Sequence, residues 1–121
     1  MPAANLDLDG DRVIEQGSFW MLDILYPGNA SGAMLRGQIR KDYGDDLLAE
    51  FRSGQAVYDE ETNKTRLTIL LNASTTAKIP VPNPNEFWRY DVLFTAPGTE
   101  PRRLVQGKVY VSPGVTTNAR N

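Results

Sequence analysis

The last strand-like stretch of the chain decides the fold class, and it reads LVQGKVYVSPGVT over residues 104–116. Val105, Val109 and Val111 recur at even spacings within it, the period of two that is typical of a half-buried β-strand. Ser112-Pro113-Gly114 then ends the pattern, because proline removes a ladder donor and glycine permits a sharp turn. The stretch therefore predicts the closing strand of a small β-sandwich.

Runs with the same alternation recur along the chain at intervals of about 12–15 residues, separated by clusters of glycine, proline, asparagine and aspartate. Seven or so such strands indicate an all-β sandwich or barrel, with Trp20 and Trp88 as its core anchors. Residues 1–11 are expected to form a polar N-terminal arm, and residues 116–121 a polar C-terminal tail. The clearest runs cover residues 18–26, 33–41, 65–71 and 87–95.

Composition removes several classes of function. The chain has 121 residues with no cysteine and no histidine, so a Ser-His-Asp or Cys-His mechanism and a thiolate or imidazole metal site are excluded. The net charge is −2, from 13 basic and 15 acidic residues spread along the sequence, which argues against binding to nucleic-acid phosphates. No apolar run has the length of a membrane span. We therefore expect a protein that is not an enzyme, holds no cofactor, and contacts neither nucleic acid nor membrane.

Three alternating acidic residues near the start of the chain, Asp7, Asp9 and Asp11, are weak candidates for a calcium site, since calcium prefers oxygen ligands. They lack the order and the distal glutamate of a calcium-binding helix-loop-helix motif. A solvated polar loop accounts for them better. We therefore predict no bound metal.

The run over residues 18–26 is apolar on both faces. Trp20, Leu22 and Ile24 share one face by the period of two, while Met21 and Leu25 fall on the other. A single inner core covers only one face of a strand. Met21 and Leu25 are therefore expected to need a second covering, either an unusually thick core or a partner that adds to an edge strand.

The aromatic residues leave an alternative function open. A carbohydrate-binding receptor module would stack sugars on an exposed aromatic platform, with calcium at the three aspartates. Residues that alternate within strands are more often part of the core, and we prefer that interpretation. The residues concerned are Phe19, Trp20, Phe87, Trp88, Tyr90 and Phe94.

Five short motifs, taken together, resemble a known family. In their order and spacing they look like the immunoglobulin-like (Ig-like) adaptor domain of tailed-bacteriophage virion proteins, similar to the N-terminal domain of phage baseplate upper proteins. The resemblance covers residues 13–117, which is most of the chain. The motifs are EQG at residues 15–17, LRGQIR at 35–40, STTA at 74–77, WRYDV at 88–92 and VQGKVYVSP at 105–113.

The resemblance implies an Ig-like antiparallel β-sandwich of about seven strands over residues 12–115. It also implies a structural protein of the virion, made in the host cytoplasm, that serves as a connector or adaptor at the baseplate, tail fibre or neck. Its partners would be other phage structural proteins and further copies of itself. A capsid decoration protein is an alternative with the same fold.

Under this interpretation three surfaces are candidates for contact with partners. The first is the outward apolar pair of the run over residues 18–26, and the second is the basic outer face of the run over residues 33–41. The third is the closing strand with its tail. The candidate interface residues are Met21, Leu25, Arg36, Gln38, Arg40, Lys108, Tyr110 and Val115.

Overall fold

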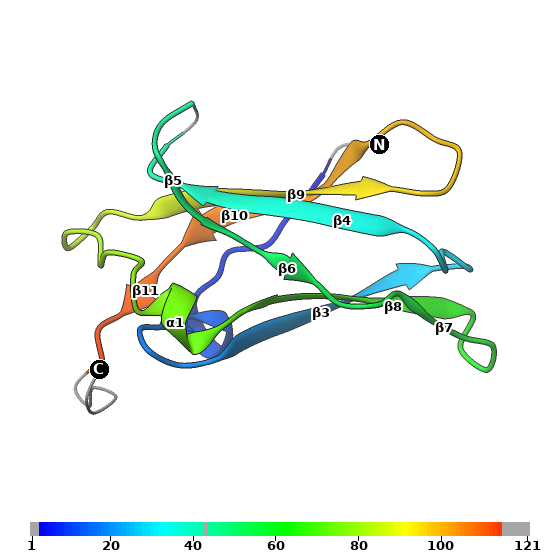
Figure 1. Cartoon of the computed structure of the whole chain (residues 1–121), viewed down its shortest axis with the longest axis horizontal. Helices are drawn as coiled ribbons and strands as arrows, with labels where there is room; N and C mark the ends of the chain where they lie inside the picture. The colour runs from blue at the N-terminus through cyan, green and yellow to red at the C-terminus, as the bar shows by residue number, and fades with distance from the viewer. Residues whose placement is uncertain (1–2, 43, 115–121) are drawn as a thin grey trace.

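Two β-sheets packed face to face form the body of the molecule (Figure 1). The computed structural model describes residues 3–42 and 44–114. The first sheet has the strand order β1-β10-β9-β4-β5, and the second has the order β3-β8-β6 with β7 also paired to β8. The first sheet contains β1 (Ala4–Asn5), β10 (Arg102–Val109), β9 (Trp88–Thr95), β4 (Met34–Arg40) and β5 (Leu47–Glu50). The second contains β3 (Trp20–Pro27), β8 (Lys64–Leu71), β6 (Arg52–Ser53) and β7 (Val57–Asp59).

The remaining elements are short. β2 (Ile14–Glu15) and β11 (Val111–Ser112) form a separate two-stranded sheet, η1 (Gly10–Arg12) is one 3-10 turn, and α1 (Ala73–Thr76) is one helical turn. The all-β prediction is confirmed, but the described residues form eleven strands rather than about seven. The difference arises because expected runs are split, as where the chain between β4 and β8 divides into β5, β6 and β7. No helix in the described ranges combines the length and apolarity that crossing a bilayer requires.

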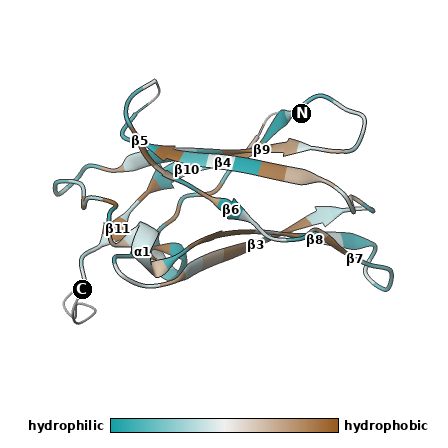
Figure 2. Ribbon diagram, in the orientation of Figure 1, coloured by the Kyte–Doolittle hydropathy of each residue, from teal (hydrophilic) through white to brown (hydrophobic). Residues whose placement is uncertain are grey.

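The predicted alternation of side chains is confirmed on the central strands. Leu67, Ile69 and Leu71 of β8 are buried. Ile69 and Leu71 share a core cluster with Tyr90 and Val92 of β9, and Leu67 clusters with Phe94. In Figure 2 hydrophobic stretches mark β3 and β8 in the lower layer and alternate with polar ones along β4 and β9 in the upper layer. The core therefore lies between the two sheets, as expected when each sheet buries one face.

The two tryptophans differ in their positions. Trp20 is a core anchor as predicted, 7% exposed, and its indole N–H donates to the Arg12 carbonyl at 2.9 Å. Trp88 is half-buried and packs against the core without being enclosed by it, and its indole donates to the Pro80 carbonyl at 2.7 Å. The second central ring is instead that of Phe51, whose centroid lies 5.5 Å from Trp20 and 5.9 Å from Tyr90.

One continuous segment passes from the first sheet to the second at Phe51 (Figure 1). β5 pairs with β4, the Phe51 N–H donates to the Gly37 carbonyl at 2.9 Å, and β6 then pairs with β8. Gly37 makes room for this crossing, because a Cβ at that position would lie 2.8 Å from the Phe51 ring. The crossing ties the two sheets together along one side of the molecule.

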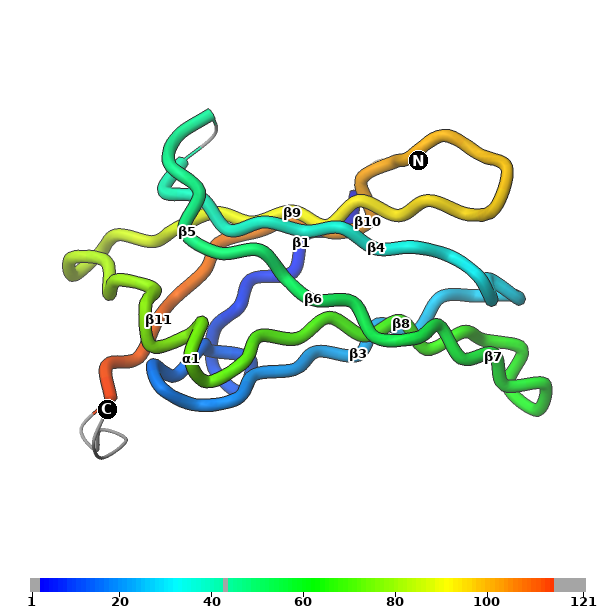
Figure 3. The backbone as a smooth tube through the Cα atoms, viewed as in Figure 1, coloured from blue at the N-terminus to red at the C-terminus, as the bar shows by residue number. Residues whose placement is uncertain are grey.

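The N-terminal segment closes the fold against the last strand (Figure 3). β1 pairs with β10 and β2 pairs with β11, both in parallel, and Leu8 between them is completely buried. Gly107 permits the close approach, since a Cβ there would lie 2.5 Å from the Leu6 carbonyl oxygen. Residues 4–8 therefore lie along β10 as part of the first sheet, whereas Asp9, Gly10 and Asp11 of the predicted polar arm are exposed. The other named strand pairs are antiparallel, in agreement with the predicted antiparallel β-structure.

Candidate interaction surface

The apolar outer surface of the second sheet is the candidate interaction surface. Met21 and Leu25 of β3 are 53% and 62% exposed, so their side chains point away from the core as predicted. Leu25 pairs with Arg66 of β8, which pairs with Val57 of β7, and Val57 is also exposed. Phe19, immediately before β3, is 59% exposed. Four of the large exposed apolar side chains in the described chain are therefore contributed by this sheet and the residue that precedes it.

The basic residues predicted for the interface lie on the other sheet. Arg36, Gln38 and Arg40 point outward from β4, whereas the candidate interaction surface belongs to the opposite face of the sandwich. Arg36 pairs with Glu50 across a distance of 3.4 Å, and Arg40 donates to the Asp45 carbonyl and to the Gln38 side chain at 2.7 and 3.0 Å. The structure does not bring these residues together with Met21 and Leu25, and their charged groups already have partners within the chain.

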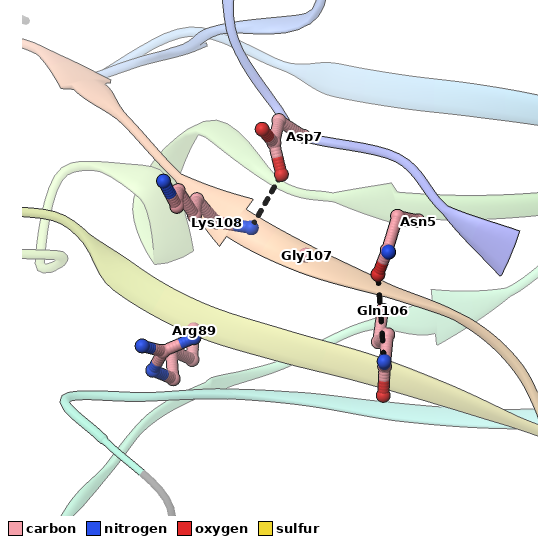
Figure 4. A pocket seen from close by; sticks show the side chains of 6 residues that line it. All are labelled: Asn5, Asp7, Arg89, Gln106, Gly107 and Lys108. Carbon is pink, nitrogen blue, oxygen red and sulfur yellow. Dashed lines mark hydrogen bonds between the residues drawn. The ribbon is translucent and has the colours of Figure 1, made fainter. Parts of the chain in front are cut away.

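The closing strand contributes to a small polar cavity of about 250 Å³ (Figure 4). The Asp7 carboxylate accepts the backbone N–H of Lys108 at 3.0 Å, so this carboxylate is occupied in holding the N-terminal segment to β10. The Lys108 ammonium and the Arg89 guanidinium lie 4.7 and 4.9 Å from the centre of the Phe87 ring. The cavity is lined by Asn5, Asp7, Arg89, Gln106, Gly107 and Lys108.

Two further predicted interface residues belong to the same end of the chain. Tyr110 follows β10 and is half-buried, with its ring 6.2 Å from that of Phe87. Val115 lies outside the described residues. The third candidate surface is thus polar, with cations lying against an aromatic ring, and offers no exposed large apolar side chain among the residues that the structure describes.

The three aspartates near the start of the chain serve separate local purposes. Asp7 holds the Lys108 backbone, Asp9 forms an ion pair with Arg12 at 3.7 Å, and Asp11 is exposed in η1. Across residues 3–42 and 44–114 there is no group of three or more acidic, histidine or cysteine side chains arranged to hold a metal ion.

The aromatic residues do not form a common exposed platform. Trp20, Tyr90 and Phe94 are buried, and Phe94 stacks on Tyr26 with centroids 4.7 Å apart. Phe87 lies beneath the two cations of the polar cavity, and Phe19 is the one broadly exposed member of the six aromatic residues considered for such a platform. The core interpretation therefore describes the strand aromatics better than a surface for stacking sugars.

The hydroxyl of Tyr90 is a structural contact that sequence analysis missed. Tyr90 is 4% exposed, and its hydroxyl donates a hydrogen bond to the Leu6 carbonyl. Burial raises the pKa of Tyr90 well above its usual value, the nearby Asp7 carboxylate adds to the rise, and Arg12 opposes it. This hydrogen bond holds the N-terminal segment against the first sheet, and it requires that the Tyr90 hydroxyl remain protonated.

Replacing Tyr90 with phenylalanine is expected to lower the free energy of unfolding at pH 7 by about 1–2 kcal/mol, because the Leu6 carbonyl loses its donor. The pKa of Tyr90 is raised in the folded state above the unfolded value of about 10. This stabilisation is therefore complete below pH 10 and is lost as the pH rises towards the folded pKa. Wild type should lose stability faster than Tyr90→Phe above about pH 10 in denaturant titrations. Equal slopes for the two proteins would contradict the assignment.

No family model and no curated protein matches this chain.

Proposed function

We propose that this protein is a structural component of a tailed-phage virion, a connector at the baseplate, tail fibre or neck. The observation that carries the proposal is the exposure of Met21 and Leu25 on the outer face of a long strand. Such side chains are expected on a surface that another protein covers. The sequence resemblance to Ig-like adaptor domains of virion proteins suggests that the covering protein belongs to a phage particle. The layered β-structure is compatible with that family.

The proposed role is to bind proteins and hold them in place, not to catalyse a reaction. Two sheets tied together at Phe51 and closed by the N-terminal segment make a stiff support. The candidate interaction surface on the second sheet would contact other virion proteins or further copies of the chain. Repeated use in a symmetric particle would add many such contacts of modest individual strength.

The test is to locate the protein in purified particles. Particles from a lysate that contains this protein are banded by density, checked for the chain by mass spectrometry, and labelled with a gold-conjugated antibody raised against it. Gold at the tail tip, fibres or neck is the expected result in negative stain, with pre-immune serum as the control. Labelling over the head would favour a capsid decoration protein instead, and purified particles without the chain would overturn the virion assignment.

A further inference from the structure

β3 is an edge strand, and the direction of its free backbone groups can be assigned from its neighbours. It pairs with β8 alone among the described elements, in a register without a shift. The Gly28 N–H donates to the Asn63 carbonyl at 2.8 Å, which makes these two residues a hydrogen-bonded pair at the end of the ladder. Hydrogen-bonded pairs then recur at every second position. The even-numbered residues of β3 therefore direct their N–H and C=O groups towards β8.

Two independent contacts support this assignment. On β8, the Thr68 carbonyl accepts from the Gly54 N–H at 2.9 Å, so Thr68 directs its backbone groups away from β3. Asp23 and Thr68 face each other in the register, and their side chains bond at 2.6 Å, as befits a closely spaced pair without backbone bonds. Pro27 agrees as well, because its missing N–H falls on the unpaired side where proline is tolerated.

Met21, Asp23 and Leu25 therefore present a row of backbone donors and acceptors to the open side of the second sheet. The other sheet edges are short or interrupted: β1 has two residues, β5 has four, and β6 and β7 are separated by residues 54–56. β3 has eight residues without a bulge, and its one charged side chain, Asp23, accepts a hydrogen bond from Thr68 of β8. A long, regular edge of this kind is a template for pairing with another strand.

We infer that β3 pairs with β3 of a second copy of this chain, antiparallel and about a two-fold axis at Leu22. When β3 pairs with β3 of a second copy, the outward backbone N–H and C=O groups of both strands are hydrogen-bonded. No free β3 edge then remains, so the assembly stops at a dimer. The outward row is odd-numbered in both copies, so only registers that match odd with odd residues are possible. The dimer joins the two second sheets into one continuous sheet.

Side chains favour the axis at Leu22 over the two neighbouring axes at Asp23 and Ile24. An axis at Asp23 places two carboxylates directly opposite each other, which is destabilising. An axis at Ile24 places Met21 opposite Pro27, whose missing N–H removes a bond. With the axis at Leu22, Phe19 lies opposite Leu25 of the second copy and Met21 opposite Asp23 of the second copy. The apolar pair covers two of the exposed side chains of the candidate interaction surface.

This inference deepens the proposed function, since it names the partner of part of the same surface, but its test does not depend on the particle. Sedimentation velocity of the isolated full chain over a wide concentration range is expected to show a monomer–dimer equilibrium. A protein that stays monomeric at near-millimolar concentration would overturn the inference and leave the particle labelling unaffected. Absence from particles would overturn the virion role and leave the dimer unaffected.

Charge changes at Met21 test the register. Met21→Asp places a carboxylate opposite Asp23 of the second copy, whereas Met21→Lys places an ammonium there, and each change occurs twice about the axis. The dissociation constant of Met21→Asp is expected to exceed that of Met21→Lys by about tenfold or more. Met34→Asp, on the exposed outer face of β4, is the matched control and should dimerise as wild type does. Equal affinities for the two Met21 variants would overturn the pairing about Leu22.

A proline at position 25 tests the backbone contact itself. The Leu25 N–H points away from β8, so Leu25→Pro removes an outward donor while the ladder to β8 keeps its bonds. Dimerisation is expected to be lost, with the near-ultraviolet circular dichroism of the ordered aromatic side chains, the buried Trp20 among them, retained as proof of folding. A folded Leu25→Pro variant that still dimerises would overturn the inference, and if the variant does not fold, the Met21 pair decides the question.

Discussion

Replacing Phe51 with alanine is expected to lower the free energy of unfolding by about 3–5 kcal/mol, the range for removing a buried aromatic side chain. The ring is 6% exposed, contacts Trp20 and Tyr90, and sits where the chain passes from one sheet to the other. Its loss opens a cavity between the sheets at the point that ties them together. Urea denaturation followed by tryptophan fluorescence measures the change.

The control for this variant is Met34→Ala, which removes an apolar side chain of comparable size from a position that is 71% exposed. That change is expected to alter the free energy of unfolding by no more than about 0.5 kcal/mol. A loss below about 1 kcal/mol for Phe51→Ala would show that the ring is not a central part of the core, against the general cost of such cavities.

Replacing Thr65 with valine is expected to cost about 2–4 kcal/mol of unfolding free energy, although valine has almost the same shape. The Thr65 hydroxyl accepts the Ala30 N–H and donates to the Gly28 carbonyl, both at 2.7 Å, and the residue is completely buried. Valine leaves both backbone groups without a partner, and a buried unpaired group costs about 1–3 kcal/mol.

Thr65→Ser is the matched variant, because it keeps the hydroxyl and removes one methyl group. It is expected to be less destabilised than Thr65→Val, which separates the hydrogen bonds from the packing of the side chain. Thermal and denaturant unfolding of both variants provide the comparison. If valine proved as stable as wild type, the loop between β3 and β4 would not depend on this hydroxyl.

The central strands could be predicted from the sequence because their signal is local. The period of two places Leu67, Ile69 and Leu71 of β8 on one face whatever the chain does elsewhere, and the structure confirms it. Phe51 was not predicted as core, since it stands alone between charged Glu50 and Arg52 and its burial depends on a crossing between sheets. Such a crossing leaves no periodic pattern.

The packing of the N-terminal segment also escaped prediction, because parallel pairing with β10 joins residues about a hundred positions apart in the sequence. Leu8 lies among three aspartates and by composition looks solvated, yet it is completely buried. Gly107 is the residue from which this packing could have been predicted. A glycine inside a strand often marks the close approach of another backbone, and here that backbone is the N-terminal segment.

The candidate interaction surface was only partly visible in the sequence. The two-sided apolar pattern correctly predicted that Met21 and Leu25 point outward, because alternation is a property of the strand itself. It could not show that β3 lies at a sheet edge, which depends on the order of strands, although Pro27 at its end is consistent with one. The partners of Arg36 and Arg40 likewise depend on β5 and the loop before it.

The parallel pairing of the first and last segments has a mechanical consequence. The described chain begins beside one end of β10 and finishes beyond the other, so the two ends leave the molecule on opposite sides (Figure 1). Tension between the termini would pull these two segments past each other and load their hydrogen bonds together, in shear, rather than opening them one at a time. Those bonds join Leu6 to Gln106, Leu8 to Lys108 and to Tyr110, Ile14 to Tyr110, and Gln16 to Ser112. If neighbouring proteins pulled on both ends of this domain, the hydrogen bonds between its N-terminal and C-terminal segments would resist the extension.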